Sequence, residues 1–172
     1  MKYFFSIFLS LVIFNVTAQK DDDIYFSNNS AEILSRDQWK MIPPGTNTIT
    51  VETGLSAAEN WKMIREKMVE AGYTFEKEDR ELNYFTTALK PIKRNMVHQL
   101  TVKVNDKTIS FRGLFNSNLS IYIGSRGSGV VSESNMTIIE KRGARESLYG
   151  IAFASLFRAS TLAGHTRVYE QK

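Results

Sequence analysis

Residues that commonly carry catalysis or metal binding are scarce in this chain, which has two histidines and no cysteine. Nucleophilic catalysis needs a nucleophile beside a base, and a zinc site needs several His or Cys ligands at short spacing. His98 and His165 are far apart and neither has a patterned partner, so we interpret each as an ordinary surface or end-capping residue. The sequence therefore predicts a protein that is not an enzyme and that holds no cofactor and no metal.

Two short segments suggest ion or phosphate loops but lack the full pattern of either. Asp21, Asp22 and Asp23 are consecutive, whereas a calcium loop alternates its oxygen ligands and includes a glycine. Residues 125–129 (Ser-Arg-Gly-Ser-Gly) expose backbone N–H groups, but the Lys and Ser/Thr of a phosphate-binding loop are missing. We interpret the first as a solvated charge run and the second as a turn.

The region from Thr48 to Leu114 predicts the elements that would position a binding surface. Ile49 and Val51 alternate with polar residues, which is typical of a strand with one buried face. Ser56 and Glu59 form a capping box that begins a helix. Its apolar stripe comprises Ala57, Trp61, Ile64, Met68 and Ala71, and Gly72 ends it.

Four more strands are predicted after this helix, because apolar residues recur at alternate positions. The four sets are Tyr73 and Phe75; Phe85, Thr87 and Leu89; Leu100, Val102 and Val104; and Ile109 and Phe111. Residues 105–107 suit a short turn of an antiparallel hairpin. Leu119, Ile121 and Ile123 also alternate, and predict an extra edge strand or a hairpin arm.

A last helix is predicted from Arg145 to Ala163, where apolar residues cover so much of the circumference that the helix is expected to be largely buried or to meet a partner. The predicted fold class is therefore α+β, in the order β-α-β-β-β-β-α. It has a five-stranded antiparallel sheet with two helices on one face.

The start of the chain predicts export. Residues 1–18 have one cation, Lys2, then an apolar run too short for a comfortable membrane span, and small residues before Gln19, so we expect a cleaved signal peptide. Residues 19–45 read as a lead-in that docks partially, and residues 46–169 as a single domain. An exported chain without cysteine has no disulfides and depends on its core for stability.

Four short motifs carry a resemblance to a known fold family over residues 46–164. They are Ser-Ala-Ala-Glu-Asn-Trp at 56–61, Glu-Ala-Gly-Tyr at 70–73, Tyr-Phe-Thr-Thr at 84–87 and Ile-Glu-Lys-Arg-Gly at 139–143. The chain resembles exported bacterial domains of unknown function that have the TATA-binding-protein fold. It is also similar in outline to the lipoprotein C component of the outer-membrane barrel-assembly machine. The resemblance implies a TATA-binding-protein-like sheet.

The sheet face away from the helices is predicted to be the binding surface. The candidate residues on it are Tyr84, Gln99, Thr101, Lys103 and Arg112, whose donors and one aromatic ring suit a carboxylate, a glycan or an extended peptide. The face is polar and mixed in charge, so no nucleic-acid partner is expected although the net charge is +4. A second candidate surface is the basic connection from Lys90 to Asn95, which could contact anionic headgroups or lipopolysaccharide.

These patterns together predict an exported, non-enzymatic binding or scaffold module of the bacterial cell envelope, periplasmic or extracellular, whose partner is an envelope protein or glycan. It is not expected to span the membrane once the signal peptide is cleaved. The alternative is a small-molecule-binding or hydrolytic domain that uses the same polar face. A binding module would show a complementary patch, and an enzyme a deep pocket with convergent titratable groups.

Overall fold

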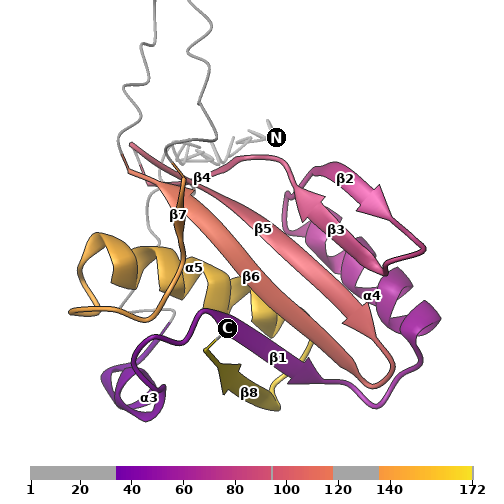
Figure 1. Ribbon diagram of the computed structural model, residues 1–172, viewed down its shortest axis with the longest axis horizontal. Helices are drawn as coiled ribbons and strands as arrows, with labels where there is room; N and C mark the ends of the chain where they lie inside the picture. The colour runs from indigo at the N-terminus through magenta and orange to yellow at the C-terminus, as the bar shows by residue number, and fades with distance from the viewer. Residues whose placement is uncertain (1–33, 94, 118–135, 172) are drawn as a thin grey trace, which may run out of the picture.

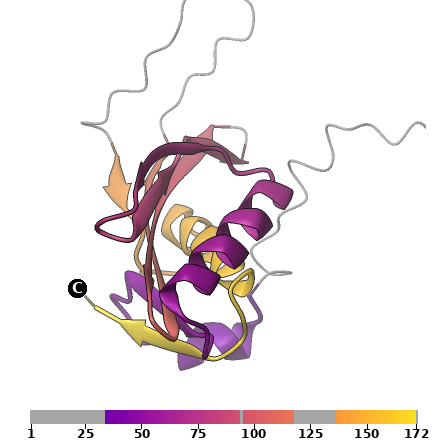
Figure 2. The ribbon, with the colours of Figure 1, turned by 90° about the vertical axis from the view of Figure 1, so that its right-hand side faces the viewer.

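The described residues form one antiparallel sheet with its two longer helices on one face. The computed structural model describes residues 34–93, 95–117 and 136–171. Figure 1 looks onto the uncovered face of the sheet, and Figure 2 shows both helices on the opposite side. The helices are α3 (Arg36–Met41), α4 (Ala57–Glu70) and α5 (Leu148–Thr161). The strands are β1 (Thr48–Glu52), β2 (Phe75–Asp79), β3 (Tyr84–Thr87), β4 (Lys90–Lys93), β5 (Met96–Asn105), β6 (Thr108–Asn116), β7 (Thr137–Ile138) and β8 (Arg167–Glu170).

The α+β class and the antiparallel sheet are confirmed. The hydrogen-bonded strand order is β2-β3-β5-β6-β1-β8, with β4 on β5 and β7 on β6. The long hairpin of β5 and β6 lies at the centre of this order, and its turn falls at Asp106 and Lys107, inside the predicted segment. Lys107 has a φ of 63°, a left-handed conformation that tightens the turn.

The predicted count of five strands is wrong, because the sheet has eight strands within the described residues alone. The unpredicted strands β4, β7 and β8 have at most four residues each, too few for an alternating pattern to show. Pairing with a longer neighbour makes them strands. The segment from Lys90 was predicted as a basic loop, but Lys90–Lys93 forms β4 instead. Leu89 was predicted to face the core, yet it is 41% exposed because it lies in the break between β3 and β4.

Helix α4 is attached to the β5–β6 hairpin through buried and capping hydrogen bonds. Ser56 and Glu59 form the predicted capping box. The Asp106 carboxylate accepts a hydrogen bond of 2.9 Å from the backbone N–H of Ala57. The buried Asn60 side chain donates to the carbonyls of Leu55 and Asn105, at 3.2 and 3.0 Å. These contacts fix the helix across the end of the hairpin.

Helix α5 is almost entirely buried, as its broad apolar circumference predicted. Ten of its residues are buried, including Phe153, Leu156 and Phe157. Gly150 lets the helix pack tightly against the preceding chain, because a Cβ there would lie 2.1 Å from the carbonyl oxygen of Arg145. The core between α4, α5 and the sheet contains fully buried aromatic residues such as Phe85 and Phe111.

The described end of the lead-in also contributes to the core. Leu34 and Ile42, which flank α3, are buried, and Trp39 of α3 meets the edge of the Phe153 ring at a centroid distance of 5.9 Å. In residues 34–45 the lead-in adds a helix and no strand. The predicted signal peptide, the aspartate run, the 119–123 strand and the 125–129 turn all lie outside the described residues.

Candidate functional site on the uncovered sheet face

The uncovered face is built from side chains that the strand register places in two rows. One row runs across the sheet through Val168, Thr50, Ser110, Lys103 and Tyr84. The next runs through Arg112, Thr101, Thr86 and Lys77, and Glu170 and Thr48 continue it on the other side of Arg112. Hydroxyl groups recur in both rows, so this is a polar surface with a few charges.

The five candidate site residues lie together on this face. Tyr84 is the register partner of Lys103, and Thr101 is the register partner of Arg112. Gln99 stands two residues before Thr101 on β5, on the same face. Thr101, Lys103 and Arg112 are exposed, whereas Tyr84 and Gln99 are half-buried.

Arg112 is held in a defined orientation by its neighbour on β1. Its Nε donates a hydrogen bond of 2.8 Å to Oγ1 of Thr48, which is only 1% exposed. The Thr48 hydroxyl in turn donates to Oδ1 of Asn47 at 3.0 Å. Because Nε lies in the plane of the guanidinium group, this bond restricts the plane and directs the terminal nitrogens away from Thr48.

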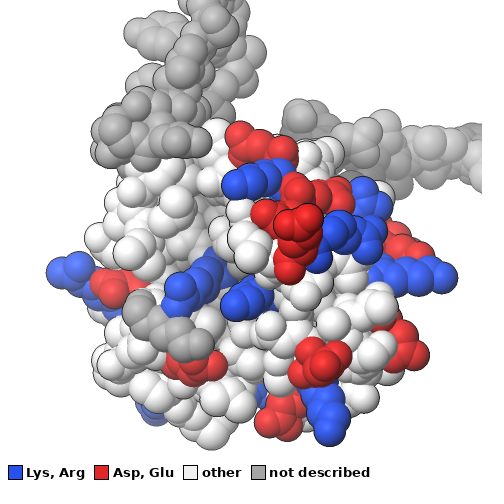
Figure 3. Space-filling view, turned by 45° about the vertical axis from the view of Figure 1, so that its right-hand side comes forward, with Lys and Arg blue, Asp and Glu red and all other residues white. Residues whose placement is uncertain are grey.

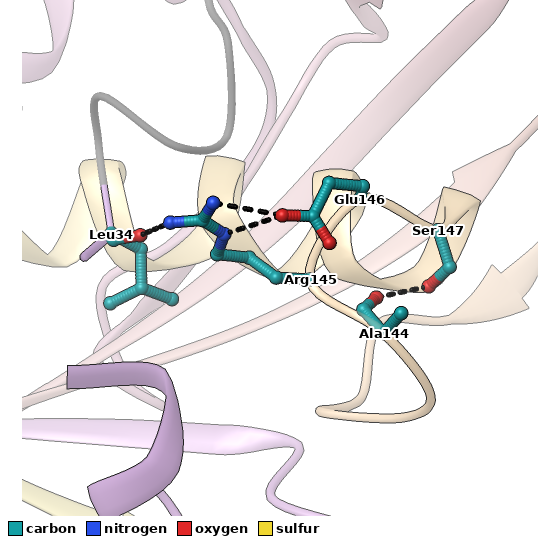
Figure 4. Close-up of polar contacts among 5 residues, drawn as sticks. All are labelled: Leu34, Ala144, Arg145, Glu146 and Ser147. Carbon is teal, nitrogen blue, oxygen red and sulfur yellow. Dashed lines mark hydrogen bonds and ion pairs between the residues drawn. The ribbon is translucent and has the colours of Figure 1, made fainter. Parts of the chain in front are cut away.

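Arg145 provides a comparison within the same protein, because its guanidinium group donates to a carboxylate and to a backbone carbonyl. Its Nε and Nη2 donate to one carboxylate oxygen of Glu146, at 3.0 and 2.8 Å, and its Nη1 donates to the Leu34 carbonyl at 3.2 Å (Figure 4). The hydrogen bond from Arg145 lowers the pKa of Glu146. Over the described residues, neither Arg112 nor Lys103 has a carboxylate within 4.0 Å. These two cations on the sheet face therefore lack the acidic partner that Arg145 has.

Tyr84 and Gln99 are restrained by contacts with β2. Nζ of Lys77 lies 5.5 Å from the centre of the Tyr84 ring, and a hydrogen bond with Tyr84 raises the pKa of Lys77. The Gln99 amide donates to the Glu76 carboxylate. On the other side of the face, the Thr50 hydroxyl lies 2.9 Å from both the Ser110 hydroxyl and Oε1 of Glu170. The side chains around Arg112 and Lys103 are thus tied to one another.

The charges of this molecule do not gather into a patch of one sign. Figure 3 shows Lys and Arg interleaved with Asp and Glu on the side of the molecule turned toward the viewer. On the sheet face itself, Lys77, Lys103 and Arg112 share the surface with four acidic residues, Glu52, Glu76, Asp79 and Glu170. Such a balanced surface lacks the broad positive field that attracts polyanions.

Two concavities in the described residues are lined by residues other than those of the candidate face. One of about 250 Å³ is lined by Pro44, Gly45 and residues 140–143. The other, about 370 Å³, lies along α4 and is lined by Leu55 and helix side chains such as Met63. Within the same ranges, no three His, Cys, Asp or Glu side chains are placed to share a metal ion. No helix in the described part is long and apolar enough to cross a membrane.

The interpretation of His98 as a surface or end-capping residue is wrong. His98 is 3% exposed, lies within β5 and packs beneath α5, where its Nδ1 is 2.9 Å from the Ser155 hydroxyl. Its ring also lies 5.8 Å from that of Tyr73. The sequence did contain a signal, because His98 is in alternation with the buried Leu100, Val102 and Val104.

Burial is the main cause of the shifted pKa values of His98 and Tyr73. It lowers the pKa of His98 to about 3, with a further contribution from the positive charge of Lys90, and it raises the pKa of Tyr73 to about 12. A hydroxyl bonded to an imidazole can act as a nucleophile and base, but only where substrate reaches it. Ser155 and His98 are both buried, so we assign this pair to the core.

Comparisons with known proteins gave no match for this chain, whether against protein-family models, curated proteins or solved structures.

Proposed function

We propose that this protein is an exported binding module of the bacterial cell envelope, and that it recognises an envelope protein or glycan with the uncovered face of its sheet. The observation that carries the proposal is the pair of exposed cations, Lys103 and Arg112. They lie on neighbouring strands and, among the described residues, have no carboxylate within ion-pair distance. Exposed cations without acidic neighbours are available to a partner, and Arg in particular suits planar recognition of carboxylates.

We also propose that the domain belongs to the TATA-binding-protein-like folds. The elements β1, α4, β2, β3, β5, β6 and α5 follow one another in the order that the sequence resemblance implies. Both long helices cover the same face, and β4, β7 and β8 are additions at the periphery of this arrangement. The proposal of export rests on residues 1–18, and the intact mass of the secreted protein tests it: a chain that retains Met1 would contradict cleavage before Gln19.

Capture of envelope components on the exported protein tests the binding role. The Lys103→Glu, Arg112→Glu variant reverses both cations of the sheet face. The matched control is Lys62→Glu, Lys67→Glu, which makes the same charge change on exposed positions of α4, on the opposite side of the sheet. Circular dichroism establishes that both variants are folded.

The expected result is one protein or glycan that the wild type and the α4 control retain and that the sheet-face variant loses. Equal retention by all three would place the binding surface elsewhere on the molecule. Retention of no component by the wild type would contradict the role of an envelope-binding module.

A further inference from the structure

We propose that the uncovered face binds a single carboxylate of an acidic glycan, held by Arg112 and Lys103 among the surrounding hydroxyl groups. This inference rests on the proposed function and specifies the chemistry of its ligand. It depends on the orientation of one guanidinium group, on the spacing of two cations and on the charge balance of the whole face.

The guanidinium of Arg112 is already oriented for a planar ligand. The 2.8 Å bond from its Nε to Thr48 uses one donor of the group and leaves the two terminal nitrogens for another acceptor. Thr48 is buried and also bonded to Asn47, so the acceptor that holds the guanidinium is itself fixed. An arginine restrained in this way loses less conformational freedom when a carboxylate binds.

Lys103 supplies a second positive charge beside this group. Its register partner is Ser110, two residues before Arg112 on the same strand and face, so Lys103 and Arg112 are diagonal neighbours. Diagonal neighbours on one face of an antiparallel pair are roughly 7–8 Å apart at their Cα atoms, a distance that two long side chains span easily. One oxyanion between them can contact both, and the Thr101 and Ser110 hydroxyls lie directly opposite the two cations.

The rest of the face favours a ligand with isolated charges over a polyanion. Three cations and four acidic residues share the face, so a membrane rich in anionic lipid or a nucleic acid would meet repulsion from Glu52, Glu76, Asp79 and Glu170. Hydroxyl groups at Thr86, Thr101 and Ser110 both donate and accept, which suits the hydroxyls of a sugar. An acidic glycan therefore matches the face better than a lipid surface.

The test is a titration of the exported protein with a hyaluronan hexasaccharide, followed by the Nε–H resonance of Arg112 in the ¹⁵N NMR spectrum. The same hexasaccharide with methyl-esterified carboxylates keeps every hydroxyl but removes the charges. Inorganic phosphate and vesicles of phosphatidylcholine with one quarter phosphatidylglycerol test the other sources of an anion. We expect the Arg112 resonance to move with the acidic hexasaccharide and not with its ester.

Two threonine variants test whether the fixed orientation of Arg112 contributes to binding beyond the attraction between opposite charges. Thr48→Val removes the acceptor of Arg112 but no charge, and should weaken hexasaccharide binding about 3- to 10-fold, the cost of ordering one long side chain. Thr161→Val is the matched control, since Thr161 lies on α5, on the other side of the sheet, and its hydroxyl donates to the carbonyl of Arg158 in the same helix. It should bind within about 2-fold of wild type, because it leaves the donors of Arg112 unchanged.

Three results would overturn the inference: equal shifts with the ester, no shift with the acidic hexasaccharide, or stronger binding to phosphate or to the vesicles. Equal affinity of Thr48→Val and Thr161→Val would refute the contribution of the oriented Arg112 guanidinium specifically. These failures are distinct from failure of the proposed function. If Lys103→Glu, Arg112→Glu still abolishes capture of an envelope component while the hexasaccharide does not bind, the face recognises a different partner chemistry.

Discussion

Replacing His98 with asparagine should remove most of the acid sensitivity of this protein between pH 7 and pH 5. His98 is buried beneath α5, and burial together with the charge of Lys90 lowers its pKa in the folded state to about 3. In the unfolded chain the imidazole has an ordinary pKa of about 6.5. Asparagine has no titrating group, and its side-chain amide can still reach toward the Ser155 hydroxyl.

The direction in which the free energy of unfolding changes with pH follows from proton binding by His98. Below pH 6.5 the His98 imidazole binds a proton in the unfolded state but stays neutral in the folded state. The free energy of unfolding therefore falls as the pH falls, until about pH 3. The slope is about 1.4 kcal/mol per pH unit once the unfolded imidazole is fully charged. Between pH 7 and pH 5 the contribution of His98 is therefore a loss of roughly 2 kcal/mol, and the full contribution is present above pH 6.5.

Urea unfolding at pH 7, 6 and 5 measures this loss of unfolding free energy, with the fluorescence of Trp39 and Trp61 as the signal. The readout is the difference between pH 7 and pH 5, which cancels any cavity that His98→Asn leaves at both pH values. Ser155→Ala is the control, because it removes the hydrogen bond of 2.9 Å but keeps the buried imidazole. It should be less stable at every pH yet keep the wild-type pH dependence. If His98→Asn loses as much stability as the wild type between pH 7 and pH 5, the account of His98 as a buried neutral group is refuted.

Two further substitutions test the packing that holds the sheet to its helices. Gly150→Ala would normally stabilise a helix, but here the added Cβ meets the carbonyl oxygen of Arg145 at 2.1 Å, so urea unfolding should show a loss of about 2 kcal/mol or more. An unchanged or higher midpoint would contradict the close approach. Asn60→Ala removes both buried bonds from α4 to Leu55 and Asn105 and should cost about 2 kcal/mol, whereas a loss below about 0.5 kcal/mol would mean that these carbonyls find other donors.

Local patterns in the sequence were sufficient to predict those helices and strands whose own residues show a clear cap or a clear periodicity. The capping box at Ser56, the stripe led by Trp61 and Ile64, and the alternation around Val51 each depend on residues a few positions apart. Helical and strand periods are properties of one element, so they can be read without knowing its neighbours. The same periods placed the candidate residues on one face of the predicted sheet, although binding by that face is still a proposal.

Only the tertiary structure decided how distant segments meet. The strands β4 and β8 form because β5 and β1 supply hydrogen-bond partners. A segment of four residues shows too little alternation for such a strand to be predicted from the sequence. The bond from Arg112 to Thr48 joins residues 64 positions apart, and it forms because β6 pairs with β1. His98 meets Ser155 for a similar reason, since α5 packs against β4 and β6, the two strands that pair with β5 at His98. The sequence by itself determined which side of each element is apolar, whereas packing in the core determined which elements became neighbours, and the oriented guanidinium on the sheet face depends on those neighbours.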